Sequence, residues 1–461
     1  MSYLINRVIG NRASGWTPSG GGGGGPTIDF YVSTSGGTGA GTIGDPWSLN
    51  HARTGAGGAL TANKTVALRA GTYTGQFDFT VDGASGQPIK FINYPGEDVV
   101  LDSGTGGSTY GVLITGDYLW FQGGVGGGDL RITRSDTSPP DAERHGAQNG
   151  TAPVGCKVIN CVLDNHLGNG ISVFAGATNF EGYGNLMFCN GRGFLSGNYA
   201  YGIYSQNTAP STKEYNDNIA VHNFGNYPFH IYAGGTGLLE SMTFRRNICQ
   251  GGWNLFGGGD PFENLTLGGG VGNGNVFYSG SFSAGALDIG YQADGAEFGF
   301  GTNNAVVTHN YILKSKTGIH SVRTGMTCTD NLFNGDLSGF TSGTFPSNTY
   351  VSSPTDASDF TLVLPNSYET GRGHVFIWNG IAEANSVNVD VSTILQNGDN
   401  YEIQDAQNYY GSALHTGTYG GGTIAFNTNS TAVVTANSVP AGRSAPVHSN
   451  KEFNVYVVRK V

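Results

Sequence analysis

Three aspartates lie close together in a glycine-rich part of the chain. Asp260 is in the segment GGGDPFEN, and Asp288 and Asp294 are in the segment ALDIGYQADGAEF. Hydrolysis of a glycosidic bond needs two carboxyl groups, one that protonates the leaving oxygen and one that acts as nucleophile or base. We therefore predict that Asp288 is a catalytic carboxylate and that Asp260 or Asp294 is its partner.

A second set of residues suits a different way of breaking the same kind of bond. A lyase removes a proton next to the carboxylate of an acidic sugar, which requires a base and a cation that neutralises the carboxylate. In this chemistry His230 or Tyr232 would be the base, and Arg323 would be the cation. Hydrolysis and elimination remain open alternatives at this point.

A repeated structure must position these residues. Propeller blades need about 40 residues or more, and leucine-rich repeats show regularly spaced leucines. Neither pattern fits, whereas a parallel β-helix does, because each of its coils supplies short strands and tolerates insertions at the turns. The repeat is an asparagine followed by mostly apolar residues, at intervals of 21 to 35 residues: Asn160, Asn185, Asn218, Asn247, Asn275, Asn310 and Asn331. We expect these asparagines to adopt the left-handed backbone of sharp corners and to stack in a hydrogen-bonded ladder.

Side chains of each strand alternate between the core and the outside of such a β-helix. Aligning the coils by one apolar position gives an inward column: Ile171, Ile203, Ile231, Leu255, Leu287 and Ile319. The following residues would point outward: Ser172, Tyr204, Tyr232, Phe256, Asp288 and His320. Tyrosine rings can stack on sugars, and glycines such as Gly258 would leave room for a chain beside them. We therefore expect an outward groove in which a polysaccharide contacts Tyr204, Gln206, Phe256, Tyr291 and His320.

The chain divides into three parts by composition. Residues 1–27 form a tail that ends in a run of glycines, which is typical of a flexible linker. Residues 28–350 carry the asparagine repeat. Residues 354–461 contain the alternating segments HVFIWNG, SVNVDVS, YEIQDAQ and FNVYVVRK, which predict a small antiparallel β-sandwich. We thus expect an all-β chain in which a parallel β-helix is followed by this sandwich.

Composition and charge exclude several classes of function. The net charge of −11 argues against binding to nucleic acid, and no apolar run is long enough to span a membrane. The five cysteines form no CxxC pair, and no motif indicates a metal ion or another cofactor. The start of the chain, MSYLINRVIGNRASGW, lacks the apolar stretch of a secretory signal. We expect a protein that acts outside the cell or on a virion, as a monomer or, if it is a tailspike, as a trimer.

Several segments carry a resemblance to a known family. TVALRAGTYTGQFDF and GQPIKFINYPGEDVVLDS resemble the opening coils of bacterial right-handed parallel β-helix proteins of the pectin-lyase-like superfamily. NIAVHNFGNYPFHIYAGG resembles a subgroup of these proteins that also has a C-terminal sandwich. The resemblance implies a right-handed β-helix and action on a polysaccharide, by a hydrolase or a lyase. The motifs of polygalacturonases and the calcium-binding aspartates of pectate lyases are absent from the sequence, so a non-catalytic glycan-binding phage or surface adhesion protein remains the alternative.

Overall fold

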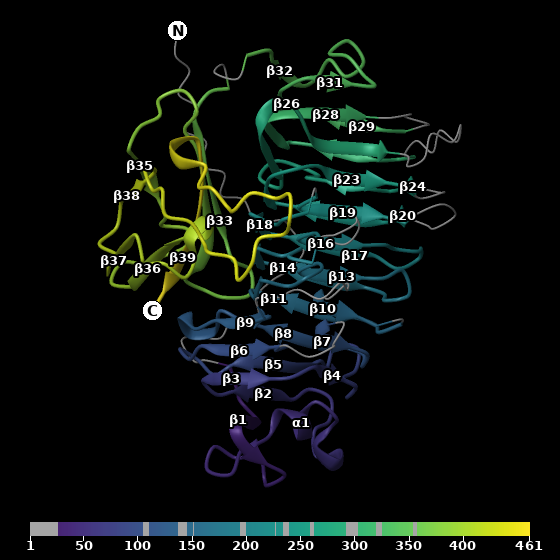
Figure 1. Cartoon of the computed structure of the whole chain (residues 1–461), viewed down its shortest axis with the longest axis vertical. Helices are drawn as coiled ribbons and strands as arrows, with labels where there is room; N and C mark the ends of the chain where they lie inside the picture. The colour runs from purple at the N-terminus through teal and green to yellow at the C-terminus, as the bar shows by residue number, and fades with distance from the viewer. Residues whose placement is uncertain are drawn as a thin grey trace.

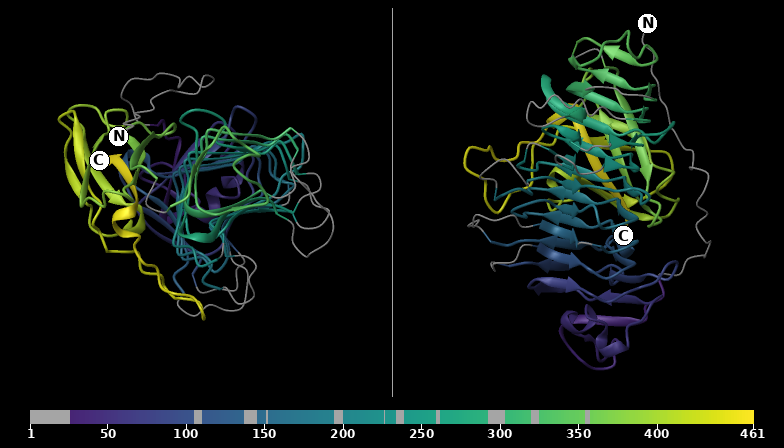
Figure 2. Two further views of the ribbon diagram at one scale, coloured as in Figure 1. Left: turned by 90° about the horizontal axis from the view of Figure 1, so that it is seen from above. Right: turned by 90° about the vertical axis from the view of Figure 1, so that its right-hand side faces the viewer.

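The computed structural model shows a chain that is almost entirely β-structure (Figure 1). It describes residues 26–104, 110–136, 145–150, 152–193, 200–225, 227–233, 239–258, 262–291, 303–319, 325–353 and 357–461, and at residues 284, 286 and 291 only the backbone. Most strands pair in parallel with the strand one coil away, and the coils wind around a common core (Figure 2). The chain is therefore a right-handed parallel β-helix, as its repeat and its resemblance predicted.

Three parallel sheets form the sides of the β-helix. Sheet 1 consists of β1 (Phe30–Gly37), β2 (Thr65–Leu68), β5 (Ile89–Asn93), β8 (Leu119–Gln122), β11 (Lys157–Ile159), β14 (Phe180–Tyr183), β17 (Lys213–Asn216), β21 (Met242–Arg245), β25 (Thr266–Leu267), β27 (Val306–Thr308) and β29 (Thr327–Thr329). Sheet 2 consists of β3 (Gly71–Thr74), β6 (Val99–Asp102), β9 (Leu130–Thr133), β12 (Val162–Asp164), β15 (Leu186–Phe188), β18 (Ile219–Val221), β22 (Ile248–Gln250), β26 (Val276–Tyr291), β28 (Tyr311–Ile319), β30 (Leu332–Asn334) and β32 (Thr349–Val351). Sheet 3 consists of β4 (Phe77–Phe79), β7 (Tyr110–Ile114), β10 (His145–Asn149), β13 (Ile171–Val173), β16 (Ile203–Ser205), β19 (Phe229–Tyr232), β23 (Asn254–Gly257), the second halves of β26 and β28, and β31 (Leu337–Ser338).

Helical segments are short. They are α1 (Leu49–Ala52) and the single turns η1 (Ala56–Gly58), η2 (Val125–Gly127), η3 (Ala406–Asn408) and η4 (Asn450–Glu452). A separate two-stranded sheet, formed by β20 (Leu239–Glu240) and β24 (Phe262–Glu263), lies beside the coils. In the described ranges, no helix has the length and apolar character needed to cross a membrane.

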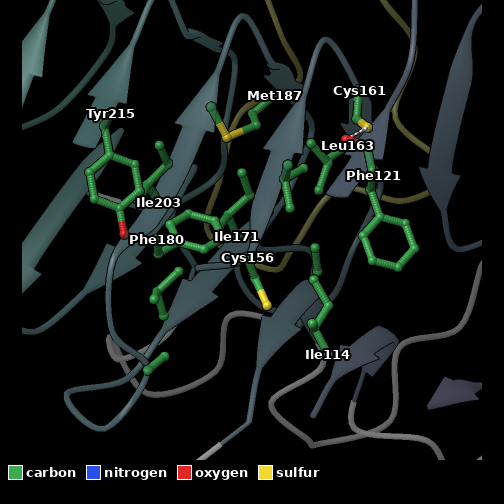
Figure 3. Packing of buried hydrophobic residues seen from close by; sticks show 14 of the residues in the cluster. Ile114, Phe121, Cys156, Cys161, Leu163, Ile171, Phe180, Met187, Ile203 and Tyr215 are labelled. Carbon is green, nitrogen blue, oxygen red and sulfur yellow. Dashed lines mark hydrogen bonds between the residues drawn. The ribbon is translucent and has the colours of Figure 1, made fainter. Parts of the chain in front are cut away.

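One continuous apolar core fills the β-helix from Val32 to Phe340. Figure 3 shows part of it, where Ile171 and Ile203 of sheet 3 and Leu163 and Met187 of sheet 2 point to the same interior. Stacked coils bury every second side chain of each strand, so the apolar side of each coil continues that of the previous one. The five cysteines are buried and unpaired, in agreement with a packing role.

The asparagine ladder is present, with two corrections. From Asn185 onwards, each Nδ2 donates to the Oδ1 one coil later at 2.8–3.0 Å, through Asn218, Asn247, Asn275, Asn310, Asn331 and Asn348. Asn160 is not a member, because its side chain pairs with Asn366 of the C-terminal part, and the backbone N–H of Cys161 bonds Asn185 instead. The left-handed backbone predicted for the asparagines occurs at Asn160, but elsewhere it belongs to the residue before the ladder asparagine, such as Asp217 or His309. The ladder asparagines themselves have no positive φ and use their side chains for the ladder.

The C-terminal part forms two antiparallel sheets. The larger consists of β33 (Phe360–Pro365), β34 (Arg372–Trp378), β39 (Phe453–Lys460), β36 (Asn400–Asp405) and β37 (His415–Thr418), and the smaller of β35 (Ser386–Asp390) and β38 (Thr423–Asn427). An apolar cluster between them includes Val375, Tyr456, Val389 and Phe426, as expected for a sandwich.

The sandwich lies along the side of the β-helix and does not cover one of its ends (Figures 1 and 2). The outward row Val162, Leu186, Ile219, Ile248 and Val276 of sheet 2 packs in one buried cluster with Phe376, Trp378, Phe453, Val455 and Val457 of β34 and β39. Sheet 2 is thus covered by the sandwich at this row.

Candidate functional site

The register of sheet 3 brings several of the predicted site residues into one outward row. Backbone pairing aligns Ser172 with Tyr204, Tyr204 with His230, His230 with Leu255, and Leu255 with Asp288. Because side chains at paired positions of a sheet lie on the same face, Tyr204, His230 and Asp288 all point to the outer side of sheet 3, with the coil of Leu255 between His230 and Asp288.

This register corrects part of the predicted alignment. Ile203 pairs with Phe229 rather than with Ile231, and Phe256 pairs with the inward Ile231. Phe256 is therefore 0% exposed and belongs to the core cluster, so it cannot contact a polysaccharide. Leu255 and Phe256 are both apolar, and the alternation of the sequence could not show which of them faces inward.

Aromatic side chains gather around His230. We call the group of Tyr201, Tyr204, Tyr227, His230, Tyr232 and Trp253 the aromatic face. The His230 ring lies 4.3 Å from the Tyr201 ring, 4.8 Å from Tyr227, 5.2 Å from Tyr232 and 5.7 Å from Tyr204, measured between ring centroids. Trp253 continues the group, with its ring 6.2 Å from that of Tyr227.

Two rings of the aromatic face lie directly on the backbone of the next coil. A Cβ atom on Gly258 would be 2.0 Å from Cε2 of Tyr232, and a Cβ atom on Gly285 would be 1.7 Å from Nε1 of Trp253. These glycines therefore make room for the rings of the protein, and Gly258 does not leave the free space for a ligand that we had expected. Tyr201 and Tyr204 are only 2% and 8% exposed, whereas Tyr227 and Tyr232 are partly exposed and Trp253 is 38% exposed. The ring surface on which a sugar could stack therefore belongs to Tyr227, Tyr232 and Trp253.

His230 is the titratable group at the centre of the aromatic face. Burial lowers the pKa of its imidazole to about 3, so the ring is neutral at physiological pH. Its Nδ1 atom is buried and has no hydrogen-bond partner among the residues that the structure describes. A neutral imidazole has one nitrogen without a proton, which can act as a base when a substrate reaches it.

A hydrogen bond and a ring contact hold Tyr204 in place. Its partners, Gln206 and Phe174, point outward two positions further along β16 and β13 than Tyr204 and Ser172. The side-chain amide of Gln206 donates to the hydroxyl oxygen of Tyr204 at 2.8 Å. The ring of Phe174, on the preceding coil, lies 6.0 Å from that of Tyr204. Gln206 thus acts on the aromatic face through Tyr204.

Asp288 lies at one side of the aromatic face. It is separated from His230 by one strand, so their Cα atoms are about 9–10 Å apart by the usual spacing of strands. The neighbours of Asp288 in the outward row, Leu255 and Gly318, carry no carboxyl group. The predicted residues Asp260, Asp294, His320 and Arg323, and the side chain of Tyr291, lie outside the described residues, so the pairing of Asp288 with a second carboxylate stays a prediction.

Sequence reasoning missed Tyr201, Tyr227 and Trp253. Each precedes a strand of sheet 3 by one or two residues, at the corner from sheet 2. The signal that could have identified them is an aromatic residue in the last two positions before β16, β19 and β23. Alternation within strands does not predict these residues, because they belong to the corners between strands and pack beside the outward side chains of sheet 3.

We also searched the described residues for a cleft and for a metal-binding group. A cleft of about 200 Å³ lies at a corner between sheets 2 and 3 and is lined by His222, Asn223, Phe224, Gly225, Arg443, Ser444 and Pro446. It contains no member of the aromatic face. The described residues include no group of three or more His, Cys, Asp or Glu side chains arranged to hold a metal ion.

Comparison with known proteins gives no family. No family model and no curated protein sequence matches the chain. Among solved structures, the chain is similar to XylC in complex with xylose, at 9% identity and a TM-score of 0.42, over 80% of this chain and 92% of the other. It is similar to pectate lyase Pel9A at 15% identity and a TM-score of 0.40, over 66% and 78% of the two chains. It is also similar to the Dettilon tailspike protein at 11% identity and a TM-score of 0.31, over 86% and 88%. Sequence identities and TM-scores this low do not show that the chain shares the activity of these proteins. The β-helix is assigned from the strand pairing of this chain itself.

Proposed function

We propose that the protein binds a polysaccharide along the aromatic face and breaks a glycosidic bond beside His230. The observation that supports this proposal is the outward row that contains Tyr204 and His230 on consecutive coils and Asp288 two coils after His230. A polymer that runs along the β-helix axis would pass these positions, and the exposed parts of Tyr227, Tyr232 and Trp253 offer it apolar ring surface.

Elimination is the reaction that the described residues favour. The neutral imidazole of His230 would take the proton from the carbon next to the carboxylate of an acidic sugar. The electron pair of that C–H bond would form a carbon–carbon double bond, and the glycosidic C–O bond would break as its oxygen leaves and takes up a proton. An arriving carboxylate also raises the pKa of a nearby imidazole and makes it a stronger base. His230 is favoured over Asp288 as the reacting group because it lies among the rings that would hold the sugar.

A panel of neutral and acidic polysaccharides tests this proposal. Reducing ends would report any cleavage, and the absorbance of unsaturated products would report elimination. We expect both signals with an acidic polymer, and we expect them to disappear in His230→Ala, whereas Asn388→Ala, at an exposed site of the sandwich, is a matched control.

Other results would change the assignment. Reducing ends without unsaturated products would indicate hydrolysis and direct attention to Asp288, which Asp288→Asn would then test. Binding without either product would indicate a glycan-binding adhesion protein. If the protein neither binds nor cleaves any polymer of a broad panel, the proposal is contradicted.

A further inference from the structure

We infer that Lys213, a lysine inside the β-helix, is a positioning residue that fixes Tyr204 in the aromatic face and thereby sets the affinity of this face for a glycan. The inference rests on the proposed function. Lys213 is the first residue of β17 in sheet 1, and its side chain is 0% exposed.

The ammonium group of Lys213 binds two backbone carbonyl groups of sheet 3. Nζ donates to the carbonyl oxygen of Phe174 at 2.6 Å and to that of Gln206 at 2.5 Å. These residues directly follow β13 and β16, on consecutive coils. Lys213 thus holds together the ends of two strands whose outer faces carry Phe174, Tyr204 and Gln206.

Both residues held by Lys213 contact Tyr204 from the outside. Gln206 donates its side-chain amide to the Tyr204 hydroxyl oxygen, and the Phe174 ring lies 6.0 Å from the Tyr204 ring. A shift of either carbonyl group would move its side chain on the opposite face of the strand. Through these two neighbours, Lys213 determines where the ring of Tyr204 lies relative to His230, 5.7 Å away between centroids.

Packing alone does not explain a lysine at this position. A buried ammonium group without a carboxylate partner costs free energy, and a methionine of similar length would fill the same space without that cost. Burial alone lowers the pKa of Lys213 to about 7, with no contribution from a neighbouring charge. What lysine adds over methionine is a second, charged donor for each of two carbonyl groups, which otherwise accept only from the backbone N–H of Ala177 and the hydroxyl of Ser205.

The experiment compares Lys213→Met with the wild type in two measurements. The first is the affinity for the polysaccharide that the panel identifies. We expect it to fall about tenfold, because the variant loses the hydrogen bonds from the charged group that hold the neighbours of Tyr204 in place. The second is the ¹⁹F NMR resonance of Tyr204 in protein labelled with fluorotyrosine, assigned with Tyr204→Phe, which we expect to shift or broaden. Lys157→Met, which removes a partly buried lysine on the outer face of sheet 1, should change neither measurement.

The pH dependence and a conservative variant separate positioning from a general effect on folding. In the wild type, affinity should fall about threefold as pH rises through 7, because a neutral amine is the weaker donor, and Lys213→Met should lack this step. Lys213→Gln keeps two N–H donors and should restore part of the affinity. It also replaces Lys213→Met if that variant does not fold.

The outcomes distinguish a failure of the positioning role of Lys213 from a failure of the proposed glycan binding. A folded Lys213→Met protein with the affinity and the Tyr204 resonance of the wild type would overturn the positioning role. A wild type that binds no polysaccharide would instead refute the proposed function, and the affinity part of this inference with it. The Tyr204 resonance would then still decide whether Lys213 positions that ring.

Discussion

Gly285 offers a test of the aromatic face that changes no aromatic residue. A Cβ atom at this position would be 1.7 Å from Nε1 of Trp253, whereas an ordinary contact begins at 3.4 Å. In Gly285→Ala the indole ring must therefore move by roughly 1.7 Å or more. Trp253 is 38% exposed, so it can swing toward solvent, and the backbone of Gly285 is not in the left-handed region, so alanine fits there.

The expected loss follows from one sugar–aromatic contact. Stacking contacts contribute about 1–1.5 kcal/mol, so Gly285→Ala should weaken polysaccharide binding about 5- to 12-fold. Folding stability should change by less than about 1 kcal/mol, because the displaced ring is largely at the surface. Titration calorimetry measures the affinity, and urea unfolding measures the stability.

Tryptophan fluorescence provides a readout that needs no ligand. Trp47 and Trp378 are about 1% exposed, so acrylamide should reach Trp253 far more readily than either of them. Gly285→Ala should increase quenching further as the ring leaves the sheet. Gly44→Ala, where a Cβ atom meets nothing within 4 Å, is the control.

A double-mutant cycle decides whether the effect passes through the ring. In a Trp253→Ala background, Gly285→Ala should cause no additional loss of affinity. An equal loss in both backgrounds would refute the reasoning, because the new methyl group would then act by another route. Unchanged quenching and affinity in the single variant would show that the ring does not lie on Gly285.

Three further predictions concern stability and the core. Asn247→Ala should lower the free energy of unfolding by about 2–4 kcal/mol, because a backbone N–H and a backbone C=O each lose a partner, whereas Asn388→Ala at the surface should change it by less than about 0.5 kcal/mol in urea unfolding. Since the pKa of Lys213 is lowered to about 7 in the folded state, the unfolded chain binds more protons between pH 7 and 10.5, and stability should rise with pH there. Unfolding at pH 7 and pH 9 should show up to about 2–3 kcal/mol of this rise in the wild type and none in Lys213→Met, and an equal pH dependence of both proteins would contradict the lowered pKa. Phe256→Ala should destabilise the β-helix by about 3–4 kcal/mol, whereas Tyr232→Ala should mainly lower glycan affinity; the reverse result would show that Phe256 does face outward.

The sequence predicted the β-helix because its repeat records a physical requirement. Asn185, Asn218 and Asn247 must each satisfy backbone groups at the same corner of successive coils, and an asparagine side chain does so with one donor and one acceptor. This requirement leaves a residue type at a regular interval, which can be found without a structure. Asn160 shows the limit, because the same motif at a corner next to the sandwich pairs with Asn366 instead.

The sequence also placed Tyr204, Gln206, His230, Tyr232 and Asp288 in the outward positions of one sheet, since alternation within a strand has a fixed period of two. It could not count positions across the corners between strands. Corners differ in length from coil to coil, and a change of one residue exchanges the inner and outer sides of the next strand.

The tertiary structure alone decided the composition of the site. Backbone pairing between β19 and β23 turned Phe256 into the core, and corner geometry added Tyr201, Tyr227 and Trp253 to the aromatic face. It also brought the amine of Lys213 under two carbonyl groups of sheet 3, although Lys213 belongs to sheet 1. Local patterns determine which residues can form a coil and its core. The phase of one coil against the next comes from hydrogen bonds and packing between residues that are about one coil apart in the sequence, and it decides which residues meet.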